Sequence, residues 1–368
     1  MIPVPAGLVT GALTGLLAVA LALGLLTAGI RGVRTCRRRR HERIAAPVRG
    51  LLLELLCTPD DEQSELLDRI AGTDRRTWAA LEPTVTSMLG KVTGRARAAL
   101  VLLCERRGSA MTAAADLSSR RAPRRGRAAQ VLGQLGHRPA VPALCRLLDD
   151  RDPEVRLAAA RALGRMGDPV AVPRLLGSLH GPRTVPPKVV TAALTSLGSG
   201  AWPGVAAGLR DPAPLVRAVA IEVLGVTGAL AQTPGIVRAL REDPHTEVRV
   251  RAARALGRLG MPEGLAPLLD AIGPGRPDAL RIVAAGSLGG LGAVAATVPL
   301  TRLLGDADAH LAGTAARSLL RLGPTGEAAL REAADGRPGT PAAAQARAAL
   351  AERAVGGTRH DVLVEVTL

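Results

Sequence analysis

One glycine recurs along this chain at a nearly constant interval, and that interval restricts the fold more than any other feature. The landmark glycines are Gly136, Gly167, Gly198, Gly228, Gly260, Gly292 and Gly323. Successive landmarks are separated by 30 to 32 residues. A fixed period of this length is the signature of a solenoid, in which each unit packs against its neighbours in the sequence. We therefore predict a repeat array.

Each unit of the repeat has the pattern of two helices. The stretch 155–167, VRLAAARALGRMG, keeps its apolar residues at helical spacing and ends on a glycine that suits a helix C-cap with positive φ. The stretch 248–260, VRVRAARALGRLG, repeats this pattern. A second helix follows, as at 170–179, and then a turn that is often Asp-Pro, as at Asp152-Pro153. Asp can cap a helix and Pro is tolerated in its first turn, so the turn starts the next unit.

The order of helix, Asp-Pro turn, Val-Arg, alanine-rich helix and Leu-Gly is similar to HEAT repeats, in particular to the phycobilisome-lyase HEAT-like subclass. The resemblance covers residues 123–323 and extends to 354. It implies an all-α fold, an α-solenoid of about eight clear HEAT-like helix pairs with one or two degenerate pairs. The resemblance is specific for the fold and not for the function, because HEAT arrays serve as adaptors, transport factors and lyase subunits alike.

An arginine recurs eleven residues before the landmark glycine in most units: Arg125, Arg156, Arg217, Arg249 and Arg281. In HEAT proteins this arginine resembles a structural ladder residue, so we expect it to bond to turn carboxylates or carbonyls of neighbouring repeats. Pro187 and Ala312 stand at this position in two units, where we expect the ladder to be interrupted.

The N-terminal segment 1–30 carries no charged side chain, and residues 8–30 are nearly all apolar or small. As a helix, residues 8–30 would span about 35 Å, enough for a hydrocarbon core of about 30 Å. An arginine-rich stretch follows, which predicts a single-pass inner-membrane protein with its N-terminus outside and the repeats in the cytoplasm. A cleaved signal peptide is the alternative. Gly7, Gly11 and Gly15 could support a homodimer through this helix, with chance composition as the other interpretation.

These observations divide the chain into five predicted segments. They are a transmembrane helix (1–30), a basic juxtamembrane linker (31–43), degenerate helical repeats with an Arg-rich insertion (44–122), the HEAT-like array (123–354) and a C-terminal tail (355–368).

The net charge of +16 is concentrated in two stretches, +6 in residues 31–43 and +7 in residues 95–127. We expect arginines of these stretches to contact an anionic membrane surface, and a solvated insertion is the alternative for the second stretch. The expected contacts are Arg37, Arg38, Arg39, Arg40, Arg120, Arg121 and Arg124. The composition argues against a nucleic-acid partner, because Trp78 and Trp202 are the only aromatic residues and stacking on bases needs more.

Three units carry a pair of arginines at the same two register positions. The pairs are Arg161 and Arg165, Arg254 and Arg258, and Arg317 and Arg321. The i, i+4 spacing places both members on one side of their helix, which in HEAT arrays usually lines the concave face. Such pairs could recognise acidic side chains or phosphate, and an ordinary exposed polar face is the alternative.

Catalytic motifs are absent from the sequence. It contains no HExxH zinc motif, no glycine-rich phosphate loop and no GxSxG nucleophile elbow. We therefore expect no enzyme activity, no catalytic or metal-binding residue and no cofactor. The sequence predicts a membrane-anchored cytoplasmic scaffold or adaptor for an unknown protein partner. An accessory subunit of a membrane-associated enzyme complex, non-catalytic or lyase-like, is the alternative.

Overall fold

A computed structural model describes residues 21, 23–25, 27, 31, 43, 44, 46–59, 62–336 and 339–365, with side chains as far as residue 354. Throughout these residues there are helices and connecting turns and no strand, so the described chain is all-α. The chain divides into two compact units, Met1–Thr112 and Ala113–Leu368.

The first unit is a small group of helices. They are a helix at 46–57, α2 (Gln63–Ala71), α3 (Arg75–Leu89) and α4 (Gly94–Arg106), while α5 (Ser109–Asp116) crosses the boundary to the second unit. Arg107 ties this group together. Its guanidinium lies 5.0 Å from the centroid of the Trp78 ring, and its Nη1 donates to the carbonyl oxygens of Ala71 and Thr73 at 2.6 and 2.9 Å.

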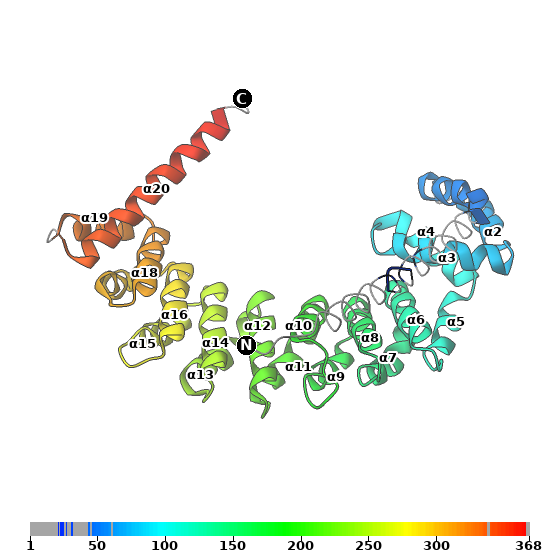
Figure 1. The fold of residues 1–368 in the computed structure, drawn as a ribbon, viewed down its shortest axis with the longest axis horizontal. Helices are drawn as coiled ribbons and strands as arrows, with labels where there is room; N and C mark the ends of the chain where they lie inside the picture. Colours follow the sequence, from blue (N-terminus) through cyan, green and yellow to red (C-terminus); the bar gives the residue numbers. More distant parts are fainter. Residues whose placement is uncertain are drawn as a thin grey trace, which may run out of the picture. The chain divides into compact units, whose positions relative to one another are not determined.

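The second unit alternates long and short helices. The long-helix row consists of α6 (Ala122–Leu135), α8 (Pro153–Met166), α10 (Pro187–Ser196), α12 (Pro214–Val226), α14 (Thr246–Leu259), α16 (Asp278–Leu291) and α18 (Ala309–Arg321). The short-helix row consists of α7 (Val141–Leu147), α9 (Val172–Gly177), α11 (Trp202–Ala207), α13 (Thr233–Glu242), α15 (Leu265–Ala271) and α17 (Thr297–Arg302). Within this unit the long helices lie side by side on the concave side of the row (Figure 1). Helices α19 (Pro324–Asp335) and α20 (Pro341–Glu365) follow.

The landmark glycines end the long helices as the sequence predicts. All seven have a positive φ, between 67° and 80°. Gly136, Gly167, Gly260 and Gly292 are left-handed C-caps. Because a side chain is strained in this conformation, the glycine period is a period of helix ends. The all-α helical repeat solenoid predicted from that period is confirmed.

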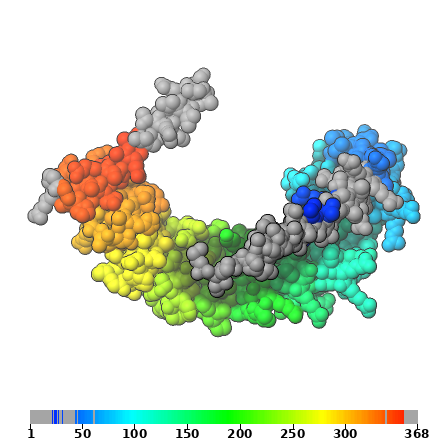
Figure 2. All heavy atoms as spheres, in the orientation of Figure 1, coloured from blue at the N-terminus to red at the C-terminus, as the bar shows by residue number. Residues whose placement is uncertain are grey.

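A second recurring glycine, three residues before the landmark, lets neighbouring long helices touch. A Cβ atom on Gly164 would lie 2.7 Å from Cα of Ala193, and one on Gly257 would lie 2.6 Å from Cβ of Ser287. Gly133, Gly225 and Gly289 meet small residues in the same way. Glycine against alanine or serine brings the backbones together, and neighbouring repeats form a continuous packed surface (Figure 2). The array therefore needs no large aromatic residue to fill the space between its long helices.

The predicted membrane anchor requires a correction. Segment 1–30 lies almost wholly outside the described residues, together with Gly7, Gly11 and Gly15, and so do Arg37, Arg38, Arg39 and Arg40. In the part of the chain that is described, no helix combines the length and the apolar character needed to cross a membrane. A span needs about 20 consecutive apolar residues, whereas α20, with 25 residues, carries charged side chains such as Arg347 and Glu352. The predicted single-pass inner-membrane location is therefore not supported.

Candidate binding surface on the long-helix row

The ladder arginines join successive repeats through aspartates in the turns. Arg217 donates from Nε and Nη2 to the two carboxylate oxygens of Asp243 at 2.6 and 2.9 Å, and the two side chains are only 11% and 5% exposed. Arg125 makes the same two-pronged contact with Asp150, with both bonds at 2.7 Å. Arg281 donates to Asp306 at 2.6 Å. In each case the aspartate lies in the turn of the next repeat, which confirms the structural role expected from the sequence.

Two further ladder arginines have no such aspartate within reach. Arg156 donates to the carbonyl oxygen of Asp150 at 2.8 Å, and Arg249 donates to the hydroxyl of Thr246 at 3.0 Å. At the positions where the other repeats have an aspartate, the following turns contain Gly181 and Pro274. The ladder is therefore interrupted at these two steps as well as at Pro187 and Ala312.

The paired aspartates are held in their charged form. Burial alone would raise the pKa of Asp243, but the hydrogen bonds from Arg217 and from the backbone N–H of His245 outweigh it, so this pKa is lowered. Asp150 shows the same balance, in which burial raises its pKa and the stronger set of bonds from Arg125 and from the N–H of Asp152 lowers it. Salt bridges of this geometry fix the register between repeats.

The six arginines of the predicted concave-face pairs lie on α8, α14 and α18 and are exposed. Among the described residues none of the six forms an ion pair with a carboxylate, in contrast to Arg125, Arg217 and Arg281. Arg165 is exposed as a whole but partly desolvated by its surroundings, and this desolvation, together with the neighbouring charge of Arg161, lowers its pKa. These cations lack a carboxylate partner within the described chain.

Three of the six converge on one hollow in the long-helix row. We call it the arginine hollow, and it has a volume of about 330 Å³. Its lining comes from α14 (Arg254, Gly257, Arg258), α16 (Ile282, Val283, Gly286, Ser287, Gly290) and α18 (Arg321). No Asp or Glu lines it. Arg317 is not in this lining, and Arg161 and Arg165 lie on α8, so the structure brings together only part of the predicted set.

Two glycines of α16 create the arginine hollow. Gly286 and Gly290 occupy the register positions that carry Arg254 and Arg258 on α14, six and two residues before the landmark glycine. Where the neighbouring long helices have large side chains, α16 has only hydrogen atoms. Gly286 and Gly290 stand in the sequence at these positions, but the pattern of charged residues alone does not single them out.

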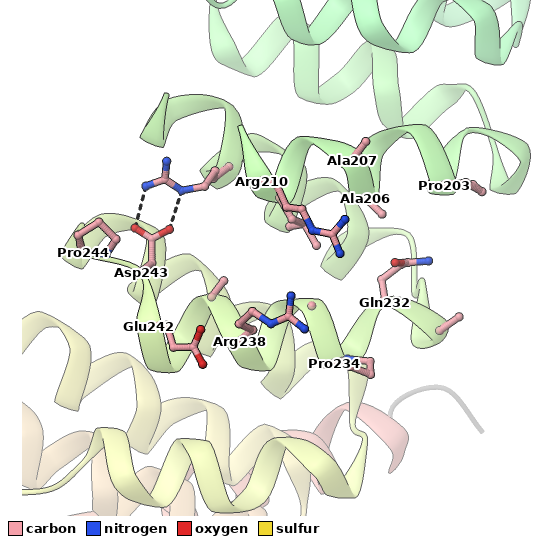
Figure 3. A pocket seen from close by; sticks show the side chains of 15 residues that line it. Pro203, Ala206, Ala207, Arg210, Gln232, Pro234, Arg238, Glu242, Asp243 and Pro244 are labelled. Carbon is pink, nitrogen blue, oxygen red and sulfur yellow. Dashed lines mark hydrogen bonds and ion pairs between the residues drawn. The ribbon is translucent and has the colours of Figure 1, made fainter. Parts of the chain in front are cut away.

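A second pocket, of about 670 Å³, lies in the short-helix row between α13 and the segment formed by α11 and η4 (Gly208–Arg210). Arg210 and Arg238 point into it from the two sides (Figure 3). Glu242 and Asp243 also line it, and Asp243 already accepts two bonds from Arg217. Opposite charges therefore offset one another here, unlike in the arginine hollow.

Some arginines of the basic stretch 95–127 form ion pairs within the chain, and others are exposed. Arg106 forms an ion pair with Asp68 at 2.9 Å, and Arg125 belongs to the ladder. Arg120, Arg121 and Arg124 are exposed at the start of α6. Their expected contact with a membrane surface stays a prediction of the sequence. Across the described ranges, no three His, Cys, Asp or Glu side chains gather in a group that could hold a metal ion.

Residues 112–198 and 203–278 match the family model of HEAT repeats. These stretches are HEAT repeats. The break between the two HEAT matches contains η3 (Ser199–Ala201). Gly198 directly precedes η3, and its backbone has a positive φ but lies outside the left-handed helical region. A comparison with curated proteins finds no match.

Solved structures share the helical repeat architecture. A mutant of Kap121p superposes with a TM-score of 0.52 and 11% identity, over 80% of this chain and 39% of that one. The complex of CpcE and CpcF of phycocyanin lyase from Nostoc sp. PCC7120 is 26% identical over 60% of this chain and 92% of that one, with a TM-score of 0.31. An engineered protein is 20% identical over 82% of this chain and 98% of that one, with a TM-score of 0.38. The likeness to Kap121p concerns the fold alone.

Proposed function

We propose that the second unit is a protein-interaction scaffold whose long-helix row binds an acidic region of a partner protein. The observation that carries this proposal is the contrast between two sets of arginines. Ladder arginines such as Arg217 are paired with carboxylates inside the array, whereas the exposed arginines of α8, α14 and α18 lack a carboxylate partner in the described chain.

A repeat fold of this kind suits such a role. HEAT-repeat solenoids are typical of non-catalytic scaffolds, because stacked units present an extended surface. The guanidinium group is planar and offers five N–H donors in a fixed geometry that matches a carboxylate. The arginines recur at the same two register positions on three helices, so an extended acidic segment could contact them in succession.

The test is crosslinked co-purification of the full chain from its native cells through a C-terminal tag. In one variant all six long-row arginines become serine. A matched variant removes the same charge from exposed arginines of the short-helix row and its turns, namely Arg138, Arg146, Arg210, Arg238, Arg241 and Arg302. We expect a stoichiometric protein partner that is lost only in the long-row variant.

Three results would contradict the proposal. They are retention of the partner by the long-row variant, equal loss in both variants, and recovery of no partner by the unaltered chain. Equal loss would mean that total charge, and not the long-helix row, attracts the partner.

The sequence resemblance to the phycobilisome-lyase HEAT-like subclass supports a second candidate, an accessory subunit of an enzyme complex, either non-catalytic or lyase-like. A lyase-like subunit would hold a tetrapyrrole, which aromatic pocket residues usually contact, and this chain offers only Trp78 and Trp202. Visible absorbance of the purified chain after incubation with a bilin distinguishes the candidates. A new stoichiometric bilin band would favour the lyase-like subunit over the scaffold.

A further inference from the structure

We propose that the arginine hollow is a receptor for the carboxylate of a Glu or Asp side chain on an acidic peptide segment of the partner. This inference rests on the proposed scaffold function and names the place on the long-helix row where recognition is centred. It is carried by three observations: an unbalanced positive lining, an arginine that is already oriented, and a glycine that packing does not require.

The lining is unbalanced in charge. Arg254, Arg258 and Arg321 come from two different helices, and no acidic side chain lines the space between them. Ile282 and Val283 of α16 form an apolar part of the wall. An apolar wall keeps water from screening the charges fully, so three guanidinium groups beside it attract an anion more strongly than the same groups on an open surface.

One of the three guanidinium groups is held in place. Arg321 of α18 donates from Nη2 to the carbonyl oxygen of Gly286 on α16 at 2.7 Å and to the hydroxyl of Ser318 at 3.2 Å. A guanidinium has five N–H donors, so Nε and Nη1 of Arg321 are left for a ligand. Because the side chain is oriented before binding, less conformational entropy is lost when a carboxylate arrives.

Gly286 has no packing reason to be glycine. A Cβ atom there would meet its nearest neighbour, Cγ2 of Thr314, at 3.5 Å, an ordinary contact, and its φ is not positive. By contrast, a Cβ atom on Gly257 or Gly289 would collide with the next helix. A glycine in the middle of a helix costs about 0.5–1 kcal/mol relative to alanine. Glycine at this position leaves open the part of the arginine hollow that a side chain would fill.

The size of the hollow suits a side chain rather than a small ion alone. Its volume of about 330 Å³ is many times the roughly 30 Å³ that a water molecule takes up in the liquid. A Glu side chain and part of its backbone fit this space. Because the hollow opens on the row that also carries Arg161, Arg165 and Arg317, a longer acidic segment could continue along neighbouring helices.

The experiment measures binding of a fluorescein-labelled poly-Glu peptide to the full chain by fluorescence anisotropy, with a poly-Gln peptide as the neutral control. Gly286→Leu fills the hollow without changing any charge. A double variant, Arg254→Ser with Arg258→Ser, removes two cations from the hollow. Its matched control, Arg138→Ser with Arg146→Ser, removes two exposed cations from the short-helix row and its turns, outside the proposed binding surface.

We expect the Gly286→Leu and Arg254/Arg258 variants to bind poly-Glu about tenfold more weakly, the effect of losing one charged hydrogen bond. The Arg138/Arg146 control should stay within about twofold, since it keeps every arginine of the long-helix row. Circular dichroism verifies that each variant is folded. Should leucine prove too large to fold, Gly286→Ala narrows the hollow with an ordinary contact and should weaken binding in the same direction.

Unchanged affinity in a folded Gly286→Leu variant would overturn the inference, and so would equal weakening in the Arg138/Arg146 control. The inference would also be overturned if inorganic phosphate binds, as measured by displacement of a fluorescent anion, and poly-Glu does not. Each of these outcomes leaves the scaffold proposal standing if co-purification still yields a partner that depends on the long-helix row. If co-purification yields no partner that depends on the long-helix row, the scaffold proposal is refuted, whether or not the peptide binds.

Discussion

Arg321 reaches from α18 to α16, where its Nη2 atom donates a hydrogen bond of 2.7 Å to the carbonyl oxygen of Gly286. Its contact differs in kind from that of Arg217, which is neutralised by the carboxylate of Asp243. A carbonyl orients a guanidinium but leaves its positive charge unbalanced. The paired ladder arginines Arg125, Arg217 and Arg281 thus differ from Arg321 in the acceptor beside them, a carboxylate in the first three and a carbonyl in Arg321.

Gly257→Ala should destabilise the array. The new Cβ would lie 2.6 Å from Cβ of Ser287, so α14 and α16 must move apart. Overpacking of this kind typically costs about 1–3 kcal/mol. Thermal unfolding followed by circular dichroism should show a lower Tm, whereas Gly286→Ala on the same row should leave Tm unchanged or raise it. Equal Tm values for the two variants would mean that close helix contact does not set the glycine pattern.

Breaking the ladder ion pair of Arg217 and Asp243 should lower the free energy of unfolding more than breaking an exposed ion pair. Asp243→Ala leaves the largely buried Arg217 without its carboxylate, and we expect a loss of about 2 kcal/mol in the free energy of unfolding. Asp149→Ala removes the partner of Arg174, whose side chain is 52% exposed, and should cost less than about 1 kcal/mol. Urea unfolding of the two single variants makes the comparison. A larger effect at Asp149 would argue against the ladder as a source of stability.

Stability should fall in acid because of the ladder aspartates. The pKa of Asp243 is lower in the folded chain than the value of about 3.9 for an unfolded Asp. The unfolded chain therefore binds the proton of Asp243 more readily than the folded chain does. The stabilisation by the ionised carboxylate is complete above the unfolded pKa and is lost as pH falls through the folded pKa. Tm measured from neutral pH down to pH about 3 should decline less steeply in Asp243→Asn than in the unaltered chain. Parallel curves of Tm against pH would show that protonation of Asp243 does not contribute to the loss of stability in acid.

The described cysteines should differ sharply in reactivity. Cys57 is exposed, whereas Cys104 and Cys145 are buried. Burial, aided by the nearby charges of Glu82 and Glu105, raises the pKa of the Cys104 thiol to about 12, and burial also raises the pKa of Cys145. In a Cys36→Ser background, Ellman's reagent should modify Cys57 rapidly and the other two only after denaturation, since the thiolate is the reactive form. Additional substitution of Cys57 should abolish the rapid phase, and rapid reaction of Cys104 would mean that its helix opens readily.

The glycine period, the helical spacing of apolar residues and the Asp-Pro turns were sufficient to predict an all-α repeat array. They report local conformation, in which a glycine with positive φ such as Gly167 ends a helix wherever it stands. The same reasoning was wrong for the membrane. An apolar stretch is only a candidate span, and in the described chain no helix has the length and apolar character of one.

By itself, then, the sequence determined the repeat, the helix ends and the positions of the arginines, because each depends on neighbours a few residues away. Only the tertiary structure decided which arginines are paired. Asp243 is 26 residues from Arg217 in the sequence, and it meets that arginine because one repeat stacks on the next. The arginine hollow was likewise decided by stacking, since the missing side chain of Gly286 becomes a space only when α14 and α18 stand on either side of it.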